Sequence, residues 1–169
     1  VNLAESFSPI NSNVINLTIT GNGRTIHGDY RFHFLSISSQ QVVIINNLTM
    51  YRCKDEHNGG AILNNGTLTI INSTLNGNHA RQGGGIYNYH GNLTIINSTL
   101  NNNFGDNYGG AIYKNDGTLN IINSTLNNNG AKQGGGIYSF SYEVDNITDC
   151  NFKENYAESG GAIYAYCDL

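Results

Sequence analysis

The chain is poor in charged residues, has a single proline and has no tryptophan. Charged residues make up 12% of its 169 positions, against roughly 25% in an average soluble domain. No cluster of lysine or arginine marks a surface for nucleic acid or an anionic membrane, so we expect neither partner. No apolar run approaches the roughly 20 residues of a membrane-spanning helix, so we expect no membrane insertion by this segment.

Asparagine and glycine are abundant instead, with 29 and 21 copies. Both residues disfavour helices, while a hydrophobic fraction of 38% is too high for a disordered polar tract. We therefore expect one ordered domain without helices. The first ten residues lack the basic and apolar regions of a secretion signal, so we expect any such signal to lie outside this sequence.

A period of about 25 residues runs through most of the chain. The element Gly-Gly-(Ala/Gly)-Ile occurs five times, and its isoleucines are spaced by 24, 26, 25 and 26 residues. Between these copies, Leu68-Thr-Ile-Ile-Asn-Ser-Thr-Leu75 recurs in similar form at 93–100 and 119–126. Short β segments separated by turn residues at a fixed period predict a coil that returns on itself once per repeat. The predicted fold is an all-β, single-stranded parallel β-helix with roughly six to seven coils.

The repeats divide the chain in two. Residues 1–50 are less regular, and we interpret them as an N-terminal cap and irregular first coils. Residues 51–169 carry the regular Gly-Gly-(Ala/Gly)-Ile repeats. The last residues, 162–169, look like an interrupted repeat, so we expect truncation at this end and further repeats of the same chain as neighbours.

Stacked coils place equivalent side chains about 4.8 Å apart. We expect one interior stack of Ile62, Ile86, Ile112, Ile137 and Ile163, and another of Leu75, Leu100, Leu126 and Phe152. Side-chain amides both donate and accept hydrogen bonds, so inward asparagines can form ladders along the axis. Two columns are candidates for such structural ladders: Asn47, Asn72, Asn97 and Asn123, and Asn78, Asn103, Asn129 and Asn155.

If the first column points inward, its Asn-x-Ser/Thr sequons cannot carry glycans. Only sequons near turns, such as Asn65, Asn92 and Asn146, then remain possible acceptors.

These motifs resemble the repeats of known surface proteins. The pairing of Phe152-Lys-Glu-Asn155 with Gly160-Gly-Ala-Ile163 resembles the repeats of chlamydial polymorphic membrane proteins. The longer pattern from Gly109-Gly-Ala-Ile-Tyr113 to Ile122-Asn-Ser-Thr-Leu126 is similar to adhesin-like proteins of methanogenic archaea. The resemblance implies a right-handed β-helix, an extracellular position on the cell surface through regions outside this sequence, and contact with other cells or glycans. Three repeats depart from it with Leu in place of Phe, and two with Gly in place of Ala.

Aromatic residues form the main candidate ligand-binding surface. If the repeat isoleucines point inward, alternation along the strand directs the residues after them outward. A column of exposed rings would suit stacking against sugars or an apolar partner. Its members are Tyr87, Tyr89, Tyr113, Tyr138, Phe140, Tyr164 and Tyr166. A purely structural role, in which the tyrosines stack on one another, remains open.

The segments that vary between repeats are a second candidate surface. They lie at 54–58, 79–82, 104–108, 130–133 and 156–159, and they contain much of the charge. Variation on one face of a solenoid often marks a recognition face. A merely solvated edge explains it equally well.

The sequence predicts no catalytic site, metal site or cofactor. Paired carboxylates on neighbouring coils would suit glycoside hydrolysis, but the acidic residues share no column. The histidines have no metal-ligand spacing, and the threonines form no unbroken array of the kind that binds ice. Among the cysteines, only Cys150 and Cys167 are close enough to consider a disulfide.

We therefore predict a non-enzymatic cell-surface adhesin or adhesin-like module. Its expected partners are surface glycans or proteins of another cell, contacted through a repetitive β-helix face. The alternative is a fragment of a polysaccharide-active lyase or hydrolase whose catalytic coils lie elsewhere. Further carboxylates on adjacent coils would favour the enzyme.

Overall fold

The computed structural model describes residue 13 and residues 15–166, which form strands and no helix. The largest sheet bends around the molecule in the order β16-β13-β9-β5-β3-β6-β10-β14-β17, with β1 paired to β3. Its strands are β1 (Asn16–His27), β3 (Val42–Tyr51), β5 (Thr67–Ile71), β6 (Thr74–Asn76), β9 (Asn92–Ile96), β10 (Thr99–Asn101), β13 (Thr118–Ile122), β14 (Thr125–Asn127), β16 (Asn146–Thr148) and β17 (Asn151–Lys153).

A second sheet, the front sheet, has the order β18-β15-β12-β8-β4-β2. Its strands are β2 (Leu35–Ile37), β4 (Ile62–Asn64), β8 (Ile86–Tyr89), β12 (Ile112–Asn115), β15 (Ile137–Phe140) and β18 (Ile163–Tyr166). A third sheet contains only β7 (His79–Gln82) and β11 (Phe104–Tyr108).

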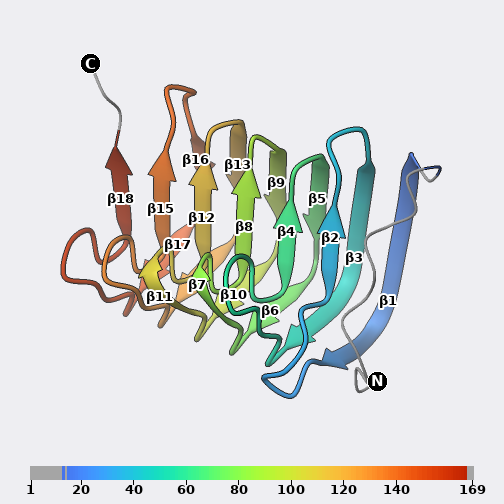
Figure 1. Cartoon of the computed structure of the whole chain (residues 1–169), viewed down its shortest axis with the longest axis horizontal. Helices are drawn as coiled ribbons and strands as arrows, with labels where there is room; N and C mark the ends of the chain where they lie inside the picture. The colour runs from blue at the N-terminus through green and yellow to red at the C-terminus, as the bar shows by residue number, and fades with distance from the viewer. Residues whose placement is uncertain (1–12, 14, 167–169) are drawn as a thin grey trace.

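Each strand pairs in parallel with its counterpart one repeat away. In the front sheet Ile62 pairs with Ile86, Ile86 with Ile112, Ile112 with Ile137 and Ile137 with Ile163. The chain is therefore a parallel β-solenoid of about six turns, as the period predicts. Figure 1 shows the front sheet as a row of arrows along the long axis of the molecule.

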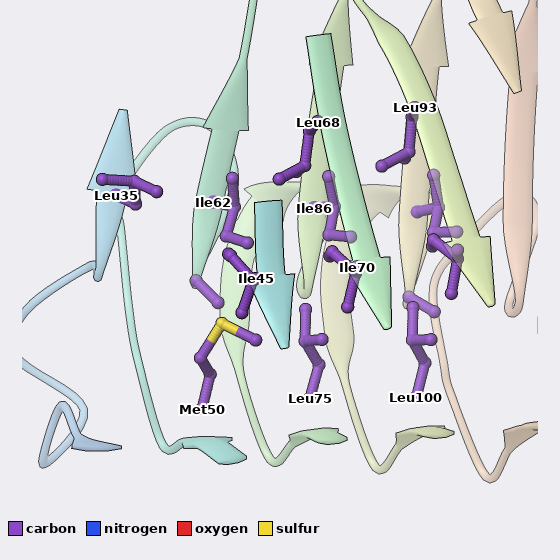
Figure 2. Packing of buried hydrophobic residues seen from close by; sticks show 14 of the residues in the cluster. Leu35, Ile45, Met50, Ile62, Leu68, Ile70, Leu75, Ile86, Leu93 and Leu100 are labelled. Carbon is purple, nitrogen blue, oxygen red and sulfur yellow. The ribbon is translucent and has the colours of Figure 1, made fainter. Parts of the chain in front are cut away.

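Both predicted interior stacks are confirmed. Ile62, Ile86, Ile112 and Ile137 are fully buried, and Leu35 precedes them in the same column. Leu75, Leu100 and Leu126 form the second stack, with Met50 before them and Phe152 after them. Figure 2 shows Met50, Leu75 and Leu100 in one row beneath the isoleucines. At the last coil the burial ends, and Ile163 is 40% exposed.

Each repeat has two glycines, and each position requires glycine for a different physical reason. The first, for example Gly109, has a φ of +62°, where a Cβ atom would lie 2.3 Å from the carbonyl oxygen of Ile112. The second, for example Gly110, has a hypothetical Cβ 2.2 Å from the carbonyl oxygen of Gly135 on the next coil. One glycine is therefore required by the turn and the other by the close stacking of coils.

The N-terminal part continues the same solenoid. β1 pairs in parallel with β3, with a shift of register between Thr20 and Arg24. The expected cap at the start of the chain, and the pairing of Cys150 with Cys167, involve positions outside the described residues.

Candidate recognition surface

The predicted inward ladder of Asn78, Asn103, Asn129 and Asn155 is present. The Oδ1 atom of Asn103 accepts hydrogen bonds from the backbone N–H and from Nδ2 of Asn78, at 3.1 and 2.9 Å. Its own Nδ2 donates to Asn129 Oδ1 and to the carbonyl oxygen of Leu75. The same pattern joins Asn129 to Asn155. Each interior amide therefore satisfies backbone and side-chain groups of its neighbours.

The other predicted ladder, Asn47, Asn72, Asn97 and Asn123, does not point inward, so that prediction is wrong. All four side chains are exposed, and all four residues have positive φ values, between 45° and 53°. Asparagine tolerates this left-handed conformation better than most residues. The column therefore forms an outer turn, and burial does not exclude glycans from its sequons.

A buried serine column beside this turn was not predicted. Ser73 and Ser98 each accept a hydrogen bond from the backbone N–H one coil away, at 3.1 Å, and each donates to a carbonyl oxygen of its own coil. Ser124 is the next member of the column, and Cys150 follows it, with its Sγ 3.2 Å from the carbonyl oxygen of Thr148. The recurring Asn-Ser-Thr triplets were the available signal, because alternation puts the serine on the opposite side from its neighbours.

The tyrosines after the repeat isoleucines stack in one continuous column on the outer side of the front sheet. Ring centroids are 4.8 Å apart for Tyr87 and Tyr113, and 5.2 Å apart for Tyr113 and Tyr138 and for Tyr138 and Tyr164. Tyr108, from a variable segment, packs against the same column at 4.8 Å from Tyr138. Tyr87, Tyr113 and Tyr138 are only 8–9% exposed. These three therefore follow the structural alternative, in which the tyrosines stack on one another, because neighbouring rings cover one another.

Burial also changes the titration of these phenols. It raises the pKa of Tyr113 to about 12, with further contributions from Tyr87, Tyr138 and Tyr108. Burial likewise raises the pKa of Tyr87 and of Tyr138. Tyr87, Tyr113 and Tyr138 are therefore neutral at physiological pH.

A second aromatic row on the front sheet is open to solvent. Tyr89, Phe140 and Tyr166 are 39–40% exposed. In register they occupy one column, read in the order Tyr89, Asn115, Phe140 and Tyr166. Phe140 and Tyr166 are stacked at 5.4 Å with an interplanar angle of 7°. We call this column the outer aromatic row.

The variable segments are more ordered than loops. Phe104 pairs with His79 in a short parallel sheet, and bridges continue this pairing to Gly130 and Tyr156. Polar side chains on this side interact between coils, such as His79 Nε2 and Asp106 Oδ1, which are hydrogen-bonded at 2.8 Å. The segments therefore form a second exposed face, with Phe104 40% and Tyr156 54% exposed.

A buried lysine breaks the regular interior. Lys114 takes the inward position that Asn64 and Asn88 occupy on the preceding coils, and its side chain is completely buried. Its Nζ lies 2.5 Å from Asp145 Oδ1, and Ser139 donates a hydrogen bond to the other oxygen of that carboxylate. Asp145 belongs to the connection between β15 and β16, which therefore closes over the lysine. This ion pair was not predicted.

Among the described residues, no group of three or more His, Cys, Asp or Glu side chains could hold a metal ion. Within residues 15–166, Cys53 and Cys150 form no disulfide. Burial raises the pKa of Cys53 to about 12, so its thiol is protonated and unreactive at neutral pH.

Comparison with protein families finds a match in two segments of the chain. Residues 72–89 and 149–166 match the Chlamydia polymorphic membrane protein repeat. These repeats are part of the parallel solenoid and include its ladder positions Asn78 and Asn155. The repeat indicates a protein associated with the outer surface or the membrane, and solenoids of such repeats are typically non-catalytic. No curated protein and no solved structure matches the chain significantly.

None of the segments that the structure describes is a helix long and apolar enough to cross a membrane.

Proposed function

We propose that this chain is a non-catalytic adhesin or adhesin-like module of a cell-surface protein. Its partners are glycans or proteins on the surface of another cell, and regions outside this sequence attach it to its own cell. The polymorphic membrane protein repeats support a surface position. Further repeats of the same chain would stack on the coil of β16, β17 and β18, where Ile163 is exposed.

The observation that carries this proposal is the outer aromatic row. Tyr89, Phe140 and Tyr166 lie on a sheet whose coils are joined by continuous hydrogen bonding, so their positions are fixed before binding. The outward positions of the front sheet carry no charged residue. A rigid, uncharged face with exposed rings is suited to weak contacts that add up along the axis.

The proposal is tested by measuring binding of the labelled chain to a panel of cells and to a polysaccharide array. The test variant carries Tyr89→Ser, Phe140→Ser and Tyr166→Ser. Removing exposed aromatic anchors should weaken binding at least tenfold, since a few such residues dominate most interfaces. A matched control carries Phe104→Ser and Tyr156→Ser on the variable segments, whose rings are similarly exposed.

Circular dichroism and thermal unfolding establish that both variants are folded. Equal binding by the test variant and the unchanged chain, or loss in the control alone, would overturn the assignment to the front sheet. Failure of the folded chain to bind any cell or polysaccharide would overturn adhesion itself.

A further inference from the structure

We infer that a hollow in the outer aromatic row binds a single neutral sugar residue, with the ring stacked on Phe140 and its hydroxyl groups bound by Asp116 and its neighbours. This inference rests on the proposed adhesive function and names the site and the ligand class for it. The hollow has a volume of about 180 Å³ and is lined by His90, Asn115, Asp116, Phe140, Ser141 and Tyr142.

The hollow exists because the row lacks a ring at one position. Asn115 lies in register between Tyr89 and Phe140, and its shorter side chain leaves open the space that a stacked ring would fill. Tyr166 covers one face of Phe140, at 5.4 Å, and Asn115 lies on the opposite side of Phe140 in the row. A sugar ring in the hollow would therefore continue the stack against the free face of Phe140.

A longer turn supplies one wall of the hollow. Two residues connect β8 to β9 and β12 to β13, whereas residues 141–145 connect β15 to β16. This longer turn carries Tyr142, which is 75% exposed. Its end is fixed by the ion pair of Asp145 with the buried Lys114. Two departures from the repeat, the lysine and the longer turn, thus occur together at the hollow and hold its wall in place.

The polar lining suits hydroxyl groups. Asp116 Oδ2 lies 3.1 Å from His90 Nδ1, and Asp116 Oδ1 accepts a hydrogen bond from Ser141 Oγ at 3.4 Å. The hydrogen bond from His90 is the main reason that the pKa of Asp116 is lowered. The carboxylate is therefore ionised at neutral pH and can accept charge-assisted hydrogen bonds from hydroxyl groups.

Size and charge exclude other ligand classes. No lysine or arginine lines the hollow, and Asp116 would repel a phosphate, a sulfate or an acidic sugar. A protein partner would need an interface of about 1,200 Å² or more, whereas this hollow accommodates one small ring. A neutral, polyhydroxylated ring has both the apolar C–H face and the hydroxyl groups that the lining complements.

The test uses saturation-transfer NMR with methyl glycosides of glucose, galactose, mannose and N-acetylglucosamine, and with glucuronic acid as the acidic probe. We expect at least one neutral glycoside to bind and glucuronic acid to bind at least tenfold more weakly. Phe140→Ala and Asp116→Ala should each raise the Kd at least tenfold. Phe104→Ala and Asp106→Ala are matched controls, because Phe104 is about as exposed as Phe140, and Asp106 is about as exposed as Asp116 and also pairs with a histidine.

Asn115→Tyr keeps the result interpretable if another variant unfolds. The new ring should continue the aromatic row and fill the hollow, so sugar binding should be lost without a fall in Tm. No binding of any neutral glycoside, preference for glucuronic acid, or an equal effect of the controls would overturn the inference. Cell binding measured on the unchanged chain separates the two proposals. Adhesion of the unchanged chain without binding of any neutral glycoside overturns the subsite alone.

Discussion

Asn97 and Asn103 lie on the same coil, six residues apart, and each belongs to a column of asparagines that repeats once per turn. Asn103 is 1% exposed, and its amide makes hydrogen bonds to both neighbouring coils. Asn97 is exposed, and its backbone has a φ of 49°. One column is an interior ladder and the other is an outer turn, although the residue type and the period are the same.

The difference shows that asparagine serves two physical requirements. In the interior its amide is the requirement, because each buried donor and acceptor must find a partner. In the outer turn its tolerance of the left-handed conformation is the requirement, and the side chain is secondary. A repeated asparagine therefore identifies a corner of the solenoid but does not show which side of the backbone its side chain occupies.

The largest expected effect is in the interior ladder. Asn103→Ala would leave the backbone N–H and Nδ2 of Asn78 without their acceptor and the carbonyl oxygen of Leu75 without its donor. Each buried group left unsatisfied costs about 1–3 kcal/mol, so we expect the free energy of unfolding to fall by about 4 kcal/mol. Urea denaturation measures this, with Asn97→Ala on the same coil as the control. Equal losses in the two variants would refute the distinction between the columns.

Much of the fold could be predicted because stacking makes equivalent positions repeat. The period, the glycine pair and the alternation of Ile112, Tyr113 and Lys114 were sufficient to predict parallel coils and both hydrophobic stacks. Alternation also puts Lys114 on the same side as Ile112, so its inward direction was visible in the sequence. The ion-pair partner of Lys114 could not be predicted, because Asp145 lies in a turn that departs from the repeat.

A smaller effect is expected at Lys114, which takes the inward position that an asparagine occupies on the preceding coils. Asp145→Ala would leave the ammonium group of Lys114 buried without its counter-ion, and should cost about 3 kcal/mol, at the lower end for broken buried pairs. Lys114→Ala should cost less, about 1–2 kcal/mol, because the remaining carboxylate is 20% exposed and can be hydrated. Urea denaturation of both single variants and the double variant gives the coupling between them. Strictly additive effects would contradict a direct interaction.

The candidate surface was less predictable than the fold. The outward direction of Tyr113 follows from alternation, but its burial depends on Tyr108, which lies in a segment that differs between repeats. The exposure of Phe140 follows partly from the neighbouring Asn115, a single departure from an aromatic column. Alternation along a strand predicts the direction of a side chain. Its exposure depends on which side chains of other coils contact it after the coils stack.

The smallest effects belong to the outer turn, and they test whether the backbone or the amide matters there. Asn97→Gly keeps the left-handed conformation accessible and loses only an exposed hydrogen bond from Asn123, so the free energy of unfolding should change by less than about 0.5 kcal/mol. Asn97→Val forces a β-branched residue into that conformation and should cost about 1–2 kcal/mol. Thermal and urea unfolding of both variants make the comparison. If glycine proves as costly as valine, the exposed amide rather than the turn stabilises this column.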